Sequence, residues 1–339
     1  MTADAPDLAS DVDTANQPLL VVDGLVKHFA VRGGLLLRNR GVVHAVDNVS
    51  LQIHPGETLG LVGESGCGKS TLGRAVLWLD PPNAGTVALH GQDLRTCSRT
   101  EIRALRKQMQ IVFQDPYESL NSRHTIGQIL TEPFIIHQLG AATERARWVG
   151  ELLERVGLPS AARDKYPHEF SGGQRQRVGI ARAIALNPKL IVCDEAVSAL
   201  DVSVQAQILN LLLGLQRERG LAMLFIAHDL AVVKHVSDRI AVMYLGKIVE
   251  TASSRTINAT PRHPYTKALL SAIPVPDPTR ARQRILLAGD VPSPIAPPPG
   301  CRFHTRCPHA VDRCRTEEPR LEIIDGGASV ACHRWRELA

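Results

Sequence analysis

A glycine-rich segment in the first quarter of the chain has the residue types and the spacing that bind phosphate. Residues 63–70 read GESGCGKS and fit the pattern G-x-x-x-x-G-K-[ST], after an apolar run and before a segment with helical spacing. Its glycines let backbone N–H groups turn inward around phosphate oxygens, and a helix that begins near Lys69 adds its positive end. The alternative is a chance glycine turn, but ordinary residue frequencies produce this pattern in only about 1% of chains of this length. The segment therefore predicts a nucleotide phosphate site.

The side chains of this segment have separate expected roles. We expect Lys69 to neutralise the β- and γ-phosphates of ATP, and the hydroxyl of Ser70 to hold Mg²⁺. The remaining residues expected to contact the nucleotide are Gly63, Ser65, Gly66, Cys67, Gly68 and Thr71.

A second segment supplies two acids that complement the first. Residues 190–195 read LIVCDE, an apolar run that ends in Asp194 and Glu195. We expect Asp194 to hold Mg²⁺, directly or through water, and Glu195 to polarise the attacking water as general base. Acids commonly follow strands at helix starts, so this run is weak when it stands alone. Together with the phosphate segment it predicts ATP hydrolysis.

The elements around these residues predict a parallel α/β sheet with its ligand loops at the carboxyl ends of the strands. The region from about 116 to 182 has helical spacing and no convincing strand, which indicates a helical insertion within that fold. Apolar runs predict buried strands at 57–63, 189–195 and 221–228, a hairpin edge at 239–250, and two antiparallel strands at 19–29 and 43–53 joined by a long loop.

Composition and charge exclude several classes of protein. Of the 339 residues, 44% are hydrophobic and 22% are charged, which is typical of a globular chain. The formal net charge is only +5 and no long Lys/Arg run occurs, so a nucleic-acid partner is not expected. The acidic, polar residues 1–18 predict a flexible tail rather than a signal peptide. No run approaches the roughly 18 apolar residues of a membrane span, so we expect a cytosolic protein that reaches a membrane only through another subunit.

With these residues in place, the sequence resembles the ATP-binding cassette (ABC) ATPases. Residues 170–174 (FSGGQ) are similar to the signature motif of that family, and residues 198–201 (SALD) to its D-loop. Gln114 matches the Q-loop glutamine, His228 the switch histidine, and Phe29 the aromatic residue that stacks on adenine. The motifs occur in the family's order between residues 19 and 255, which we expect to form the nucleotide-binding domain. Taken singly, each residue has a simpler explanation. The SGGQ run would be a helix cap, His228 a core histidine, and Phe29 a packing residue at a strand edge.

The resemblance implies roles for these residues. Gln114 would join Ser70 and Asp194 around Mg²⁺, and His228 would contact the γ-phosphate. In the family, the signature residues close on the nucleotide of an opposing subunit, so hydrolysis requires a dimer with two ATP sites. The residues expected to contact nucleotide through these motifs are Phe29, Gln114, Ser171, Gly173, Gln174 and Asp201.

Further stretches resemble one branch of the family, the ATPases of dipeptide and oligopeptide importers. They occur at 113–123, 166–183 and 263–274, and in a Pro- and Cys-rich tail. The inserted stretch VRGGLLLRNRGVVHAV resembles the F-type member of the paired ATPases. This resemblance implies a heterodimer with a D-type sister, two membrane permeases, an extracytoplasmic peptide-binding protein, and a peripheral location on the cytoplasmic face of the inner membrane. The helical insertion would receive the coupling helices of the permeases.

Four cysteines crowd the tail, which we expect to form an extension over residues 256–339. Because cytosolic disulfides are rare, Cys301, Cys307, Cys314 and Cys332 indicate a metal site, either tetrahedral zinc or an iron–sulfur cluster. Four unrelated buried cysteines are the alternative. The resemblance to importer ATPases implies a [4Fe–4S] cluster, with zinc as the second choice. Three histidines lie among the cysteines and could replace one of them as ligand: His304, His309 and His333.

Two other functions compete with transport. Soluble cassette proteins that act on ribosomes or DNA usually carry two cassettes or a long coiled-coil insertion, and this sequence has neither. A regulatory subunit that binds ATP without turnover would not need Glu195 and His228. Within importers, dipeptides, longer peptides, glutathione, nickel chelates and sugars are all compatible cargoes, because the ATPase does not touch cargo.

Overall fold

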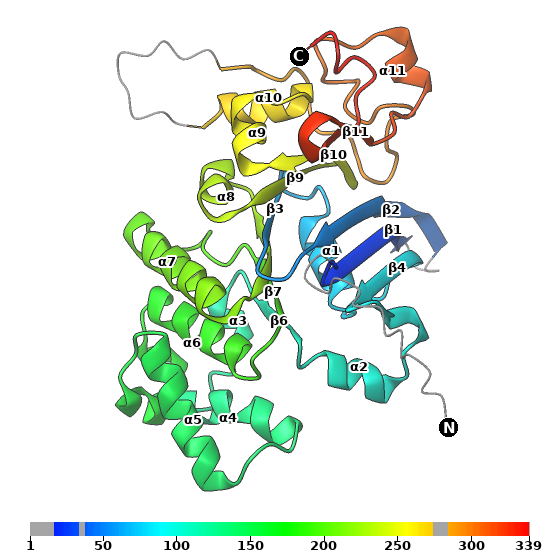
Figure 1. Ribbon diagram of the computed structural model, residues 1–339. Coiled ribbons are helices and arrows are strands. Elements are labelled where there is room, and N and C mark those ends of the chain that lie inside the picture. Colours follow the sequence, from blue (N-terminus) through cyan, green and yellow to red (C-terminus); the bar gives the residue numbers. More distant parts are fainter. Residues whose placement is uncertain (1–16, 34–37, 274–283, 339) are drawn as a thin grey trace, which may run out of the picture.

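The structure is a computed structural model that describes residues 17–33, 38–273 and 284–338, and it is built around two sheets. One sheet has four strands in the order β2-β1-β4-β5, and the other has eight in the order β11-β12-β10-β9-β3-β8-β7-β6 (Figure 1). Most of the tail expected over residues 1–18 lies outside the described residues. No helix in the described ranges is long and apolar enough to cross a membrane.

The four-stranded sheet is antiparallel and begins the chain. Its strands are β1 (Leu20–Gly33), β2 (Arg38–Ile53), β4 (Ala84–Leu89) and β5 (Gln92–Asp93). The expected long loop between the first two strands is wrong, because pairing continues outward from Phe29↔Val43 to Gly33↔Arg38. One register shift, between Val31 and Arg32, lies in this outer part of the ladder, and the strand pairing continues past it.

The eight-stranded sheet combines a parallel centre with an antiparallel edge. The parallel pairs are β9–β3, β3–β8, β8–β7 and β7–β6, and β10, β12 and β11 add antiparallel strands beyond β9. The bounds are β3 (Thr58–Val62), β6 (Met109–Val112), β7 (Leu190–Asp194), β8 (Ala222–Ala227), β9 (Arg239–Tyr244), β10 (Lys247–Ser253), β11 (Glu322–Ile324) and β12 (Ala328–Val330). The predicted buried strands and the hairpin edge are confirmed at these positions.

Both faces of this sheet are buried, which explains the continuous apolar runs. Along β7, Ile191 and Cys193 belong to one hydrophobic cluster, and Leu190 and Val192 belong to the other. A parallel sheet that is covered on both faces needs apolar residues at every position rather than at alternate ones. Three helices follow its strands: α1 (Lys69–Val76) after β3, α7 (Val202–Arg219) after β7 and α8 (Leu230–Val236) after β8.

The expected helical insertion is present and forms an arm at one end of the molecule (Figure 1). The described residues between 116 and 184 contain no strand. Its helices are α3 (Pro116–Ser119), α4 (Ile126–Ile136), α5 (Ala142–Arg155) and α6 (Gly172–Ile184), with 3-10 turns η3 (Ser160–Asp164) and η4 (Pro167–Glu169). Before the arm, η2 (Leu94–Thr96) and α2 (Arg99–Leu105) connect the two sheets.

Residues after 255 pack against the opposite end of the large sheet. Strand β12 pairs with β10, so the C-terminal part of the chain continues the sheet that carries the phosphate segment. The other elements here are α9 (Ser254–Ala259), α10 (Pro264–Ser271), α11 (Asp312–Thr316) and the 3-10 turn η5 (Asp325–Gly327). We call residues 284–338 the C-terminal extension.

Candidate functional site

Four neighbouring strands of the large sheet end at one edge, and each leads directly into a predicted site residue. The register aligns Val62 with Ala227, and Asp194 with Ile226. Gly63 follows β3, Asp194 ends β7, His228 follows β8, and Gln114 comes two residues after β6. Parallel strands with aligned carboxyl ends therefore bring together residues that are up to 165 positions apart in the chain, since 228 − 63 = 165.

The phosphate segment forms a tight loop between β3 and α1. The ammonium group of Lys69 is 4% exposed and donates to the carbonyl oxygens of Gly63 at 2.8 Å and Glu64 at 3.1 Å. Gly68 has φ 107°, and a Cβ there would lie 1.9 Å from the carbonyl oxygen of Ala45. Only glycine fits that position, so the loop can lie directly against the backbone of Ala45.

A hydroxyl and a carboxylate meet beside the loop. The Ser70 hydroxyl donates to Asp194 Oδ1 at 2.8 Å. Burial raises the pKa of Asp194, although the hydrogen bond from Ser70 opposes the change. The two contacting oxygens, one of them a carboxylate with no salt bridge among the described residues, fit the ligand preference of Mg²⁺.

The second acid turns away from β7 and faces the histidine after β8. Glu195 has φ 47°, an uncommon left-handed conformation for a non-glycine residue, and its backbone N–H donates to Ile226 O at 3.0 Å. Its Oε2 lies 3.4 Å from His228 Nδ1. Glu195 is largely buried while His228 is 54% exposed, so the pair presents its histidine to solvent at the edge of the sheet.

The signature residues lie at the start of α6, in the helical arm. Ser171 caps this helix and exchanges hydrogen bonds with Gln174 in a capping box. A Cβ at Gly173 would lie 2.3 Å from Val204 Cγ1, so this glycine lets α6 approach α7 closely. Asp201 caps α7 and is exposed. Ser171, Gln174 and Asp201 are exposed, and among the described residues no hydrogen bond or ion pair joins their side chains to the phosphate loop.

Phe29 and Gln114 are the two other exposed members of the predicted set. Phe29 lies on β1 with its ring 40% exposed, and Lys27 Nζ lies 5.1 Å from the ring centroid. Gln114 lies in the exposed turn after β6. Both positions leave the side chain open to a ligand.

Two residues that the sequence did not single out hold the phosphate loop from behind, Tyr265 and Arg306. The backbone N–H of Glu64 donates to the hydroxyl of Tyr265 at 2.9 Å. Arg306 donates from both terminal nitrogens to the Glu64 carboxylate, at 2.8 and 3.1 Å. Tyr265 belongs to a stretch singled out by its resemblance to importer ATPases, and Arg306 directly precedes Cys307, but neither has a spacing that predicts contact with residue 64.

The four tail cysteines line one small cavity together with His304, His309 and His333. Burial raises the pKa of the thiols of Cys301 and Cys332, to about 12 and about 11. Within the described ranges, no three of these side chains bring ligand atoms within 4.8 Å of one another. A single tetrahedral zinc with Zn–S bonds of about 2.3 Å would hold its sulfurs about 3.8 Å apart. The type and number of donors fit a thiolate-bound group, but their spacing is wider than one zinc ion requires.

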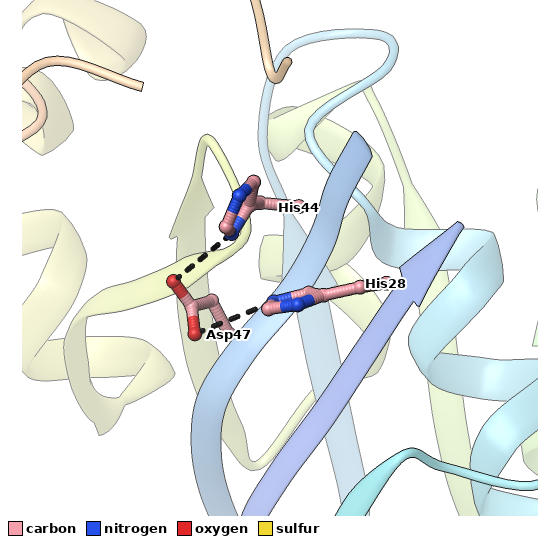
Figure 2. A group of neighbouring side chains, drawn as sticks. All are labelled: His28, His44 and Asp47. Atoms are coloured by element: carbon pink, nitrogen blue, oxygen red, sulfur yellow. Dashed lines mark ion pairs between the residues drawn. The ribbon is translucent and has the colours of Figure 1, made fainter. Parts of the chain in front are cut away.

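One other group in the described part of the chain has metal-binding residue types, and it joins the hairpin to the C-terminal extension. His28 and His44 face each other across β1 and β2 and point toward Asp47 (Figure 2), with nitrogen–oxygen distances of 3.6 and 3.9 Å. Arg302 already donates to Asp47. Burial alone would raise the pKa of Asp47, but the positive charges of Arg302 and Lys247 lower it. Because two cations already balance this carboxylate, the group is an ionic contact rather than a favourable site for a divalent cation.

Comparison with known proteins places this geometry in a family. The family model described as "ABC transporter" matches residues 46–198, and that described as "Oligopeptide/dipeptide transporter, C-terminal region" matches residues 249–314. A probable peptide ABC transporter ATP-binding protein of Sinorhizobium fredii is 55% identical, over 93% of this chain and 89% of the relative. A putative oligopeptide transport ATP-binding protein of Bacillus subtilis is also 55% identical, over 94% and 96%.

Solved structures share the cassette. The post-hydrolysis dimer of the ATP-binding cassette MJ0796, bound to ADP and Pi, is 29% identical with a TM-score of 0.62, over 70% of this chain and 99% of that one. The large parallel sheet, the helical arm and the phosphate loop agree with this likeness. The chain therefore belongs to the ABC transporter ATP-binding proteins, in the branch that carries the oligopeptide/dipeptide transporter C-terminal region.

Proposed function

We propose that this chain is the ATP-hydrolysing motor subunit of a peptide importer. The proposal rests on two side-chain pairs that lie at one edge of the sheet, beside the loop that contains Lys69. Ser70 donates to Asp194, and Glu195 faces His228. The relatives' printed names, which refer to peptide and oligopeptide transport, support peptides as the cargo.

Each residue at this edge has a defined task in the proposed reaction. Lys69 leaves its loop carbonyls and neutralises the β- and γ-phosphates, while Ser70, Gln114 and Asp194 would hold Mg²⁺. When bound, magnesium would neutralise part of the phosphate charge. Glu195 accepts a hydrogen bond from the attacking water and orients it in line with the γ-phosphate.

The exposed residues of the cassette complete the site across a dimer. Phe29 stacks on the adenine ring, and His228 contacts the γ-phosphate. Backbone donors at the start of α6, near Ser171 and Gly173, would bind the γ-phosphate of a nucleotide held by the opposing cassette, because a helix N-terminus attracts anions. Gln174 and Asp201 lie at the same interface. Ser171, Gln174 and Asp201 are exposed, and no hydrogen bond or ion pair among the described residues joins their side chains to this chain's own phosphate loop, which supports this arrangement.

We place the chain in a larger assembly. The cassette is formed by residues 19–255 and is followed by a region at 256–339, which includes the C-terminal extension. It pairs with a D-type sister ATPase and lies peripherally on the cytoplasmic face of the inner membrane, beneath two permeases that receive peptides from an extracytoplasmic binding protein. The helical arm contacts the permeases, so closure of the ATP dimer switches their access. An action on ribosomes or DNA is not favoured, since the relatives carry transporter names.

Reconstitution into vesicles tests this function. The complex is purified with its permeases and sister ATPase and is reconstituted into vesicles. Transport of a labelled dipeptide and a labelled pentapeptide across the membrane is then followed with ATP on the side that carries the ATPase. Uptake that requires ATP and disappears in Glu195→Gln supports the proposal, and this variant should also trap an ATP-bound dimer. An assembled complex that hydrolyses ATP but takes up neither peptide would contradict peptide import.

We further propose that Cys301, Cys307, Cys314 and Cys332 hold a [4Fe–4S] cluster, with zinc as the alternative. Their common cavity supports a shared group, and their spacing favours a polynuclear one. The chain is purified without oxygen, and its visible absorbance, iron, sulfide and zinc are measured. About four irons per chain are expected, and they should be lost in Cys314→Ser. One zinc and no iron would overturn the cluster.

A further inference from the structure

A short segment of the C-terminal extension, residues 301–307, reaches two parts of the nucleotide-binding cassette. Arg302 is buried and donates to Asp47 on β2 and to the carbonyl oxygen of Leu245 in the β9–β10 turn. Four residues later, Arg306 forms its two hydrogen bonds with Glu64. One segment therefore contacts the hairpin that carries Phe29 and the phosphate loop itself.

The contact with Glu64 is specific in its geometry. Glu64 is the second residue of the phosphate loop, and Arg306 donates hydrogen bonds to both of its carboxylate oxygens. The Arg306 side chain is only 8% exposed. A parallel, two-fold pair of this kind fixes orientation as well as charge. The Arg306 guanidinium lies against the ring of Tyr244, 6.0 Å from its centroid, which restricts its movement.

The backbone of Glu64 is held on both sides. Its N–H donates to the fully buried Tyr265, and its carbonyl oxygen accepts from Lys69. Glu64 therefore cannot turn its N–H toward a phosphate, and it serves as the fixed entry point of the loop. Tyr265 and Phe303 pack ring to ring at 5.4 Å, which joins this entry point to the same segment that carries Arg306.

Charge explains why an arginine is needed here. The Glu64 carboxylate, at the second position of the loop, lies beside the site expected to bind the phosphates. Pairing it with a positive charge keeps it from repelling them. Among the described residues, Arg306 makes the one salt bridge to Glu64. The hydrogen bonds that Arg306 donates to Glu64 raise the pKa of Arg306, so the arginine stays charged at every working pH.

We propose that Arg306 is a positioning residue for ATP: it neutralises Glu64 and, with Tyr265, fixes the entry of the phosphate loop, so that the C-terminal extension sets the affinity of the cassette for nucleotide. This inference rests on the proposed function that the Lys69 loop binds ATP. Its consequence is that the extension is part of the nucleotide site although it contacts no nucleotide.

The test compares nucleotide affinity in four variants by calorimetric titration with Mg²⁺ and the non-hydrolysable analogue AMP-PNP. They are Arg306→Gln, Arg306→Lys, Glu64→Gln and the double variant E64Q/R306Q. The matched control is Arg313→Gln, because Arg313 forms an exposed pair with Glu317 in the same extension and does not touch the loop. The unfolding temperature of each variant is recorded in parallel.

The signs of the changes separate a charge role from a merely structural one. We expect R306Q to weaken binding about tenfold, R306K to stay within about threefold of the parent, and the double variant to recover most of the loss. E64Q should bind as well as the parent or better. In steady-state assays R306Q should raise KM for ATP with little change in kcat, because Glu195 and His228 are untouched.

Several results would overturn the proposal. An affinity of R306Q equal to that of R313Q would contradict it, and so would a double variant E64Q/R306Q that binds AMP-PNP no better than R306Q. If R306Q does not fold, the double variant carries the test, since it contains no unpaired carboxylate: an affinity tenfold below that of the parent would contradict the charge role. A parent chain that binds no AMP-PNP would instead refute the proposed function, so the two failures are distinguishable.

Discussion

The two sides of the phosphate loop are built in different ways. Its front, which faces the ligand, consists of residues within eight positions of one another, and local spacing dictates its shape. Its back is held by Tyr265 and Arg306, which lie 201 and 242 positions away from Glu64. The front performs chemistry that any such loop performs, whereas the back is particular to a chain with this C-terminal extension. The comparison teaches that a motif defines a site, and distant residues set its properties.

The largest expected effect is on the front of the loop. In Gly68→Ala the new Cβ would meet the Ala45 carbonyl oxygen at 1.9 Å, in a backbone conformation that alanine rarely adopts. We expect AMP-PNP affinity to fall more than a hundredfold, measured by calorimetric titration. Gly91→Ala is the control, because Gly91 also has a positive φ but has no atom within 4 Å of the Cβ position. Equal losses in both variants would show that backbone strain, rather than the shape of the loop, is responsible.

A second prediction concerns Asp194, the partly buried acid that contacts the loop at Ser70. Burial raises the pKa of Asp194, so the folded chain binds this proton more tightly than the unfolded chain does. The associated stability is present at low pH and is lost as pH rises through the folded-state pKa. Asp194→Asn should therefore raise the unfolding temperature of the ligand-free chain by about 2 °C at neutral pH, and the difference should shrink in acid.

The same variant should weaken the Mg²⁺ dependence of AMP-PNP binding about tenfold, because Asn supplies a neutral oxygen in place of a carboxylate. Differential scanning fluorimetry and titration with and without Mg²⁺ measure the two effects. A variant that is less stable than the parent at neutral pH would show that the Ser70 hydrogen bond outweighs the cost of burying the charge.

The smallest effect is expected at the back of the loop. Tyr265→Phe removes the hydroxyl that accepts from Glu64 N and leaves the ring packing in place. We expect about threefold weaker AMP-PNP binding, since Arg306 still holds the Glu64 side chain. Tyr166→Phe, at an exposed tyrosine of the helical arm, is the matched control. A loss as large as that of G68A would mean that the front and the back of the loop are equally important.

The sequence predicted the elements that carry local signals. Apolar runs that end in Gly63, Asp194 and His228 were sufficient to place three parallel strands, because a doubly covered sheet leaves no polar position inside. The helical insertion was equally visible. The strand pairing beyond Phe29 was not, because Gly- and Arg-rich residues favour a loop and only the register of the partner strand extends the ladder.

The contacts of the C-terminal extension could not be predicted either. Nothing in the order of residues indicates that Arg302 reaches Asp47 or that Arg306 reaches Glu64, since both depend on how β12 joins β10. The sequence drew attention to the cysteines on either side of these arginines. The arginines themselves look like ordinary surface charges until the fold brings them to the cassette.

The central claim is that this edge of the sheet hydrolyses ATP with Glu195 as its base. Phosphate release from ATP is measured in the membrane complex, with Mg²⁺, for the parent, Glu195→Gln and the surface control Glu218→Gln, at an exposed residue of α7. We predict Mg²⁺-dependent turnover in the parent and in E218Q, and a loss of about a hundredfold or more in E195Q with nucleotide still bound. Turnover in E195Q equal to that in E218Q would contradict the account.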